Sequence, residues 1–394
     1  MSRTYDVVIA GGAIIGSSIA YFLSAHRDFS GRRILVVEKD PSYQFSSTVR
    51  SASSIRQQFS TAINIRISQY GIEFLRDANE LLAVNGESPG IHFHERGYLL
   101  LADETSLPTM RERVAFQQSH GVAAEILAPA QVLERFPWLS VEGIAGAATT
   151  RRGEGWFDAQ MLLNAIRRRA IANGVRYEAA EVTDLERGAG GRIAAARLSS
   201  GETISCGWLV NATGAWAGDF AGKIGLRIPV DPRKRVVFVV DCPTPLPNGT
   251  TIIDPNGLTF RPEGRLHIVH FPPPPEADLV GYDLSIDHGE FEARVWEPLA
   301  RRVPAFEQVK VTSAWAGYYD FNPFDHNALL GTVPAAPNFV FANGFSGHGV
   351  MQAPAVGRGI AELLITGAYQ TLDLGALAAT RYFEGRPLEE KNVF

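Results

Sequence analysis

Apolar and polar positions follow two periods along this chain, and their order predicts an α/β fold. Residues 7–9 form an apolar run, which is followed by a glycine-rich turn and then by Ile15 and Ile19 at helical spacing. Residues 5–24 therefore predict a buried parallel strand, a tight turn and a helix. A second apolar run, "RRILVVEKD", ends at Glu38 and predicts the next strand of the same sheet.

Other segments repeat these patterns. Residues 62–82 carry their apolar side chains on one helical face, and Asp158 is placed to cap another helix. Residues 97–104 and 143–150 predict strands of a separate layer, whereas residues 175–182 predict a strand that returns through the hairpin-like "GAGG". The stretch "SSTVRSASSIRQQFS" has too few apolar residues for a core strand, so we expect a loop followed by the start of a helix.

The order of these segments predicts two domains. At 394 residues the chain exceeds the size at which a single hydrophobic core usually stops growing. Residues 1–90, 151–225 and 326–394 are expected to form a discontinuous, Rossmann-like nucleotide-binding domain. Residues 91–150 and 226–325 are expected to form a second, mostly antiparallel β-sheet domain that binds substrate. The predicted class is therefore α/β, with an α+β organisation overall.

Composition and charge exclude several classes of function. An apolar content of 45% and a charged content of 20% are typical of a globular protein. The formal net charge is -5 and the basic clusters are scattered, so nothing favours nucleic-acid binding. The chain lacks an apolar stretch of membrane-spanning length and a signal-peptide pattern, so we expect no transmembrane segment and a cytoplasmic location. Cys206 and Cys242 lack metal-ligand spacing, which predicts free thiols and no metal site.

The first turn carries a dinucleotide-binding fingerprint with one substitution. Gly11, Ala13 and Gly16 occupy the three glycine positions of G-x-G-x-x-G, where the second glycine lets the backbone approach a pyrophosphate. Ala13 adds a methyl group there, which a small backbone shift at Gly12 would accommodate. Glu38 ends the second strand, where a carboxylate accepts hydrogen bonds from an adenosine ribose. Together these features predict a dinucleotide with a 2'-hydroxyl, bound at the helix N-terminus.

Two further motifs carry a resemblance to a known family. With the opening "GGAIIG" and Glu38, the later motifs "VNATGAWAG" and "GFSGHGVMQ" are similar in order and spacing to the FAD-dependent amine oxidoreductases of the D-amino-acid oxidase, glycine oxidase and sarcosine oxidase type. The resemblance covers nearly the whole chain. It implies that the dinucleotide is FAD, that the substrate is a small amino acid or secondary amine, and that oxygen or another acceptor takes the electrons.

The resemblance implies FAD contacts from several separate segments. The serine-rich loop would line the pyrophosphate, unless it is a solvent loop, and the "GHG" segment would start a helix facing the pyrimidine end of the flavin. A helix N-terminus there stabilises the negative charge of reduced flavin. The implied cofactor residues are Gly11, Ala13, Ile14, Ile15, Gly16, Glu38, Lys39, Ser46, Ser47, Thr48, Val182, Ala212, Thr213, Gly214, Gly347, His348, Gly349, Val350, Met351 and Gln352.

The sequence departs from the family pattern at three places. Members that tether flavin use a cysteine where this chain has Gly317, so non-covalent FAD is expected. Met351 stands where such members have a lysine that helps to hold the substrate carboxylate. Family oxidases use a lysine beside flavin N5 to activate oxygen, and here His267, Ile268 or Leu266 replaces it, depending on register. A dehydrogenase with another acceptor therefore remains open.

Four residues are predicted to act on the substrate: Arg56, Arg261, His267 and His348. Arg56 matches the family arginine that binds the substrate carboxylate at a helix start, the alternative being an ion pair inside the fold. His348 lies near the flavin or is structural. Strand alternation turns Arg261 either to the cavity or outward. An inward Arg261 beside Arg56 suits a dicarboxylic secondary amine such as iminodiacetate, and an outward one leaves a single-carboxylate site.

The resemblance implies oxidation of an amino acid or an N-substituted glycine. Hydride would leave the α carbon for flavin N5, and the resulting imine would hydrolyse to an oxo acid and an amine. Three alternatives compete with this hypothesis. One is a non-catalytic flavin-binding assembly or partner protein, and another is a D-amino-acid dehydrogenase that uses an acceptor other than oxygen. The third, an NAD-dependent dehydrogenase, accounts for the N-terminal motif but leaves "GFSGHG" unexplained.

Overall fold

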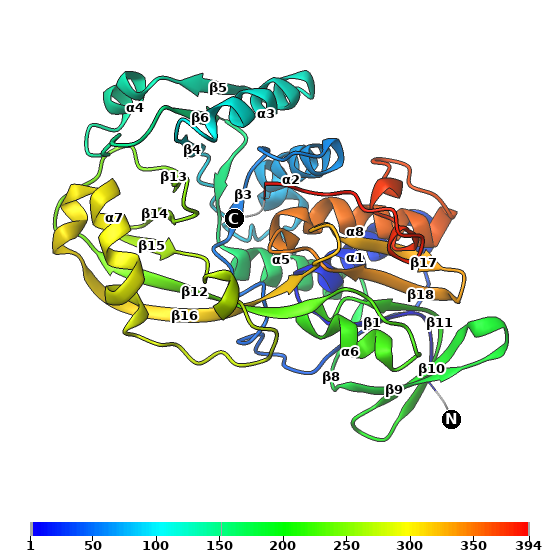
Figure 1. Cartoon of the computed structure of the whole chain (residues 1–394). Coiled ribbons are helices and arrows are strands. Elements are labelled where there is room, and N and C mark those ends of the chain that lie inside the picture. The colour runs from blue at the N-terminus through cyan, green and yellow to red at the C-terminus, as the bar shows by residue number, and fades with distance from the viewer. Residues whose placement is uncertain (1–2, 151, 393–394) are drawn as a thin grey trace.

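A computed structural model of the chain describes residues 3–150 and 152–392. These residues form two large β-sheets that lie beside one another (Figure 1). A third, two-stranded sheet is formed by segments that connect the two large sheets in the sequence. One sheet carries most of the long helices, and the other carries shorter ones on its outer side. The predicted combination of a Rossmann-like unit and a mostly antiparallel unit is confirmed.

The first sheet is built around a parallel core with strand order β17-β18-β11-β1-β2-β8. Its buried strands are almost continuously apolar, as strands covered on both faces require; Val7, Val8 and Ile9 are fully buried. The parallel strands are β1 (Arg3–Ala10), β2 (Ile34–Glu38), β8 (Arg176–Ala179), β11 (Thr203–Asn211) and β18 (Ala336–Asn343). The antiparallel additions are β9 (Val182–Arg187), β10 (Ile193–Leu198) and β17 (Leu329–Val333).

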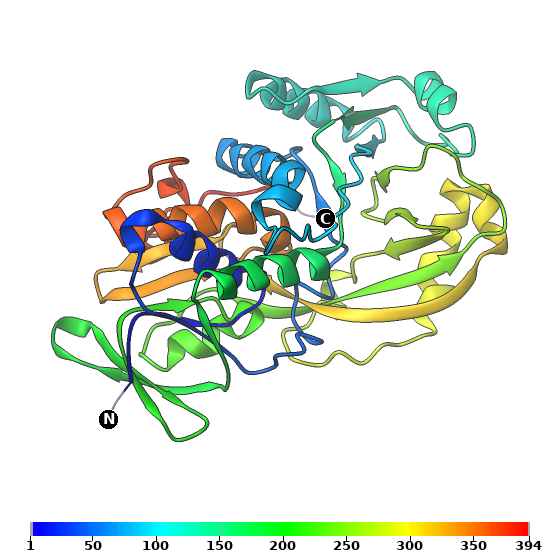
Figure 2. The same cartoon turned by 180° about the vertical axis from the view of Figure 1, so that it is seen from behind.

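Alternate residues of the parallel strands feed two separate cores. Val7 and Ile9 point toward four helices on one face of the sheet, whereas Val8 points toward the opposite face. Figure 2 shows the molecule from the side opposite to that of Figure 1. The four helices are α1 (Ile14–Ala25), α2 (Ala62–Leu81), α5 (Ala159–Ala172) and α8 (Gly349–Thr366). The short helices α6 (Ala217–Gly222) and α9 (Thr380–Phe383) pack against the core on that opposite face. Asp158 caps α5 as predicted, because its carboxylate accepts a hydrogen bond from the Met161 N–H.

The second sheet has the order β16-β12-β15-β14-β13-β4-β6-β5 and is antiparallel except for the β4–β13 pair. Its strands are β4 (Tyr98–Ala102), β5 (Ala124–Leu127), β6 (Gly146–Thr150), β12 (Asp231–Asp241), β13 (Thr251–Ile253), β14 (Thr259–Glu263), β15 (Leu266–His270) and β16 (Lys310–Phe321). The outer elements are α3 (Leu107–Ser119), α4 (Pro129–Arg135) and α7 (Trp296–Arg302) (Figure 1). Phe238, Phe260 and Leu299 belong to the core under α7, so the opposite face is turned toward the first sheet.

Both sheets draw their strands from the segments assigned to them by the sequence. We propose this assignment as the domain organisation, with 1–90, 151–225 and 326–394 forming one unit and 91–150 and 226–325 the other. Within the described residues, no helix is both long and apolar enough to cross a membrane. Cys206 is half-buried and Cys242 is buried, and both are free thiols as predicted.

Three predicted element boundaries are wrong. The expected strand at 175–182 is two strands, β8 and β9, because the chain stops pairing with β2 at Ala179. No helix starts at Arg56, since Ser54–Ile55 forms strand β3, which pairs with β7 (Gly155–Trp156) and delays α2 to Ala62. Helix α8 begins at Gly349 rather than Gly347, because Gly347 has a φ of 86°, which is incompatible with a right-handed helix.

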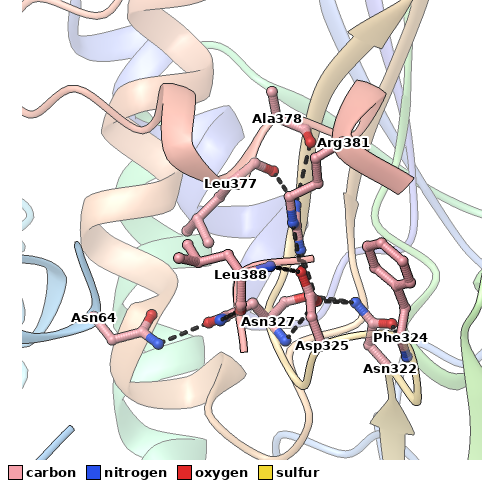
Figure 3. Close-up of polar contacts among 9 residues, drawn as sticks. All are labelled: Asn64, Asn322, Phe324, Asp325, Asn327, Leu377, Ala378, Arg381 and Leu388. Atoms are coloured by element: carbon pink, nitrogen blue, oxygen red, sulfur yellow. Dashed lines mark hydrogen bonds and ion pairs between the residues drawn. The ribbon is translucent and has the colours of Figure 1, made fainter. Parts of the chain in front are cut away.

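A buried polar cluster attaches the C-terminal residues to the loop after β16. Asp325 and Arg381 form an ion pair with N···O distances of 2.7 and 3.0 Å, and their side chains are 0% and 4% exposed. Figure 3 shows that Asp325 also accepts hydrogen bonds from the Leu388 N–H and from the Asn322 side chain. Asn327 connects the cluster to Asn64 of α2. The pair therefore links three distant parts of the chain.

We predict that Asp325→Asn lowers the free energy of unfolding by roughly 3 to 5 kcal/mol, because it leaves the buried Arg381 without a counter-charge. Urea unfolding of the flavin-loaded protein measures this. Glu384→Gln is the control, since it breaks the exposed pair with Arg386 and should cost less than about 1 kcal/mol. Equal losses in the two variants would contradict a structural role for the buried pair.

Candidate cofactor and substrate cavity

A cavity of about 510 Å³ lies where the two sheets meet. The first sheet contributes the carboxyl ends of its parallel strands and the N-termini of α1 and α8, while the second sheet contributes its inner face. Almost all of the predicted cofactor residues line this cavity; Gly16 and Gln352 do not. Ligands of parallel α/β sheets bind at this end of the strands.

The glycines of the first turn are required by close backbone approach. Gly11 has a φ of 95°, and a Cβ atom there would lie 2.3 Å from the carbonyl oxygen of Ala212. A Cβ atom on Gly16 would lie 1.9 Å from the Gly11 carbonyl oxygen, so Gly16 serves helix packing and not the cavity wall. Ala13 has a φ of -68°, which alanine adopts without strain, and it lines the cavity.

Two helices begin at the cavity wall. The first amides of a helix have no acceptor within it, so α1 and α8 both present N–H groups and partial positive charge here. Thr48 is buried, and its hydroxyl accepts a hydrogen bond from the Ile14 N–H at 3.3 Å. Ser46, Ser47 and Thr48 all line the cavity, so the serine-rich segment is not simply a solvent loop. This arrangement suits a diphosphate.

The carboxyl end of β2 offers a carboxylate and a cation. Glu38 accepts hydrogen bonds from the N–H groups of Gly12 at 2.7 Å and Asp40 at 2.8 Å, and burial raises its pKa. The Lys39 ammonium lies 3.4 Å from the centre of the Trp216 ring, and burial lowers its pKa. Val182 lies at the same end of the cavity wall as these residues, at the start of β9. The group fits an adenosine, whose ribose Glu38 would bind.

Arg56 lies at the cavity wall and is 3% exposed. Its Nη1 donates to the Gln58 carbonyl at 2.5 Å, and its Nη2 donates to the Asn392 carbonyl. The guanidinium stacks over the Phe59 ring at 4.1 Å. Burial lowers the Arg56 pKa, while the nearby Tyr98 and the carboxylates of Glu390 and Glu154 oppose that shift. A positive charge is thus held in a dry position beside the cavity.

His348 contacts Arg56 directly. Its Nε2 lies 3.1 Å from Arg56 Nη2, and its ring packs edge-on against Phe59. Burial, with the Arg56 charge as the second cause, lowers the His348 pKa to about 3. The ring is therefore neutral, and Nε2 accepts a hydrogen bond from the guanidinium. His348 immediately precedes α8 and connects the helix start to Arg56.

Arg261 turns inward, but it already has a carboxylate partner. Its Nη1 lies 2.5 Å from the Glu263 carboxylate, and its Nη2 donates to the Ala52 carbonyl at 2.6 Å. The guanidinium lies over the Trp156 ring, and its side chain is 4% exposed, whereas that of Glu263 is 54% exposed. Burial lowers the Arg261 pKa, and Glu263 opposes that shift. A cavity-facing cation is therefore neutralised within its own strand.

The prediction of His267 as a site residue is wrong in its placement. Side chains alternate along β15, so Ile268 and His270 line the cavity while His267 points to the outer core. The His267 ring lies 5.1 Å from that of Phe306, and burial lowers its pKa to about 4. Gln352 is likewise structural, since its side-chain amide donates to Asn64 at 3.0 Å.

Sequence reasoning missed several cavity residues on the second sheet. Tyr98, Arg235 and Tyr319 all line the cavity, and Arg235 forms a two-point ion pair with Asp278 at 2.6 and 3.2 Å. Burial raises the pKa of Tyr98, whose hydroxyl contacts a serine side chain. Strand alternation could have identified Tyr319, because residues 317 and 319 lie on the same face of a strand and Gly317 was already expected beside the flavin.

Gly317, the position at which the family resemblance implies a tethering cysteine in some members, is crowded here. A Cβ atom on Gly317 would lie 2.8 Å from the Arg50 Cβ and 3.1 Å from the Arg50 carbonyl oxygen. A cysteine would require this segment to move. Met351, which replaces the lysine of those members, lines the cavity and brings no charge. The residues present thus fit a dinucleotide held without a covalent bond.

Comparisons with known proteins show the family of this chain. The model of the FAD dependent oxidoreductase family matches residues 6–363. The bovine (Bos taurus) "FAD-dependent oxidoreductase domain-containing protein 1" is 39% identical over 418 residues, covering 98% of this chain and 86% of the relative. The crystal structure of L-proline dehydrogenase from P. horikoshii has a TM-score of 0.85 and 26% identity, covering 98% and 100% of the two chains. Glycine oxidase from Geobacillus kaustophilus has a TM-score of 0.82 and 25% identity, covering 96% and 99%.

We predict that the purified protein is yellow and that acid precipitation releases its FAD, because Gly317 offers no tethering atom. Absorbance of the supernatant and pellet measures this, and flavin remaining in the pellet would contradict it.

We also predict that Gly11→Ala abolishes flavin binding, because the added methyl group would collide with the Ala212 carbonyl. Flavin absorbance per protein measures the loss. Gly31→Ala is the matched control, since Gly31 also has a positive φ of 76° but has nothing within 4 Å of its Cβ position. It should keep its flavin and lose about 1 kcal/mol of stability from backbone strain. Flavin retained by Gly11→Ala would show that this turn does not form the dinucleotide site.

Proposed function

The chain belongs to the family of FAD-dependent oxidoreductases, and from this premise we propose that it oxidises the C–N bond of an amino acid or an N-substituted glycine. It is an enzyme that uses FAD, as members of this family do. FAD, which the turn at Gly11 and the start of α8 would hold, would supply the acceptor for a hydride from the substrate α carbon, and the substrate imine would then hydrolyse to an oxo acid and an amine. The protein contributes binding, orientation and electrostatics.

The position of Arg56 is the observation that carries this proposal. A guanidinium is a fixed positive charge that pairs with a carboxylate, and exclusion of water strengthens that pair. Arg56 is buried at the cavity wall, beside the loop that leads into α8. A carboxylate bound there places the neighbouring α carbon near the start of α8, whose N–H groups stabilise negative charge.

The neutral state of His348 affects whether the substrate amine is protonated when it binds. A secondary or primary amine is ready for hydride loss when it is unprotonated. Because the pKa of His348 lies at about 3, its ring is uncharged near neutral pH and adds no positive charge beside the amine. The site therefore favours the neutral amine without a dedicated base.

Glu263 favours a substrate with one carboxylate. Arg261 faces the cavity, which would suit a second substrate carboxylate, but Glu263 already supplies that anion at 2.5 Å. A dicarboxylic amine such as iminodiacetate would have to displace Glu263 from the guanidinium. We therefore propose a monocarboxylic amino acid or N-alkyl glycine as the preferred substrate class.

Ile268 favours an electron acceptor other than oxygen as a second candidate. In the oxidases of this family a lysine beside flavin N5 activates oxygen, and the residue of this segment that lines the cavity is Ile268. An apolar side chain offers no charge to stabilise superoxide. We propose a dehydrogenase on this observation, and exposure of the reduced enzyme to air tests it.

Arg56→Ala should weaken substrate binding by roughly 2 to 5 kcal/mol, because it removes the charge that pairs with the carboxylate in a dry site. Arg56→Lys should recover part of this, since an ammonium keeps the positive charge but not the planar guanidinium geometry. Anaerobic titration of flavin reduction gives the dissociation constant. An unchanged constant with lost FAD would instead assign Arg56 to the cofactor.

We expect sarcosine, glycine or D-alanine to reduce the flavin faster than iminodiacetate under anaerobic conditions. Arg261→Ala should leave those rates within about threefold, while Glu263→Gln should raise the relative rate for iminodiacetate by about tenfold because it frees Arg261. Stopped-flow absorbance measures all four substrates. Fast reduction by iminodiacetate that disappears in Arg261→Ala would contradict the one-carboxylate proposal, and reduction by no amine would favour a partner protein without turnover.

A further inference from the structure

The C-terminal segment, defined here as residues 386–392, returns from the end of α9 to the start of α2 (Figure 1). Glu390 in this segment is 0% exposed. Its carboxylate accepts hydrogen bonds from the N–H and hydroxyl groups of Ser60 and Thr61 and from the Asn64 side chain, at 2.6 to 3.2 Å. Burial by itself raises the Glu390 pKa, but the hydrogen bonds from Ser60 and Asn64 outweigh it and leave the pKa below its ordinary value.

Glu390 also fixes Asn392, the residue whose backbone contacts Arg56. It accepts a hydrogen bond from the Asn392 N–H at 3.0 Å, which fixes the backbone two residues further on. The Asn392 carbonyl then accepts from Arg56 Nη2, and the Asn392 side-chain amide donates to the Gln58 carbonyl at 2.9 Å. Arg56 Nη1 donates to that same Gln58 carbonyl. Arg56, Gln58 and Asn392 therefore form one closed hydrogen-bonded group, which Glu390 anchors.

We propose that Glu390 is a positioning residue for substrate binding: by fixing Asn392 it holds the Arg56 guanidinium in the orientation that receives the substrate carboxylate. This inference rests on the proposed function, in which Arg56 binds that carboxylate. A long side chain that is ordered before binding loses less entropy when it binds. The carbonyls of Gln58 and Asn392 hold one side of the guanidinium at the cavity wall.

A purely structural role for Glu390 explains less, because the C-terminal segment has a second anchor, which is linked to Glu390 through Asn64. The Leu388 N–H donates to the buried Asp325 carboxylate, which forms an ion pair with Arg381 (Figure 3). Loss of the Glu390 carboxylate thus leaves the segment attached two residues upstream. What it removes is the fixed position of the Asn392 carbonyl.

The test is the reductive half-reaction of the flavin-loaded Glu390→Gln variant with sarcosine, together with inhibition by acetate as a simple carboxylate. An amide presents an N–H group to donors that require an acceptor, so the anchor loosens. We expect the dissociation constants of sarcosine and acetate to rise by about tenfold, with the limiting reduction rate changed less than about threefold and FAD retained. Glu390→Asp, which keeps the charge, should recover part of the affinity.

Glu389→Gln is the matched control, since Glu389 is the exposed neighbour and should change neither constant. Thr61→Val, which removes one hydroxyl donor, provides a milder variant if Glu390→Gln does not fold and should raise both constants by about threefold. Unchanged constants, or a parallel loss of FAD and reduction rate, would overturn the positioning role. If Arg56→Ala also leaves both constants unchanged, the proposed function fails, so the two failures are distinguishable.

Discussion

The Arg56 guanidinium is buried, and its charge must be stabilised by the groups around it. A buried charge is costly unless hydrogen bonds and nearby opposite charges replace the water it has lost. The carbonyls of Gln58 and Asn392 supply the hydrogen bonds, and His348 accepts another in its neutral form. Glu390 lies nearby and contributes a favourable field. The serine-rich loop, α8 and the C-terminal segment therefore meet around one side chain.

The same principle applies to two other cations of the cavity wall. Arg261 and Arg235 each face an internal carboxylate, Glu263 and Asp278 respectively. Each of these two cations is thus already paired with a carboxylate. A substrate carboxylate must therefore compete with a protein carboxylate at these two positions. Discrimination between substrates with one and two carboxylates then depends on how firmly the internal acids are held.

The geometry of each sheet suits a different part of the site: the first sheet suits the cofactor and the second suits the substrate. A parallel sheet gathers helix N-termini at one end, which suits a diphosphate and the electronegative edge of a flavin. A mostly antiparallel sheet presents a broad face of alternating side chains, which suits a substrate whose shape varies between relatives. Because the cavity lies between them, one sheet can change its inner face without disturbing the cofactor turn at Gly11.

The sequence by itself determined the features that depend on short spacings. The strand, turn and helix around Gly11 and Gly16 follow a short pattern of spacings, although the close contact at Gly11 is with the distant Ala212 carbonyl oxygen. The order of the segments also implied a discontinuous first sheet and a second sheet. What the sequence left open was the register of β15, since a shift of one residue exchanges His267 for Ile268 at the cavity.

Only the tertiary structure decided what surrounds Arg56 and whether Arg261 is available. Ser60 and Glu390 lie 330 positions apart, and no local pattern relates them. The helix expected at Arg56 gave way to strand β3 because a partner far along the chain, β7, pairs with it. Such contacts arise from the closure of long loops, whose ends are brought together by packing and not by the propensities of the residues in between.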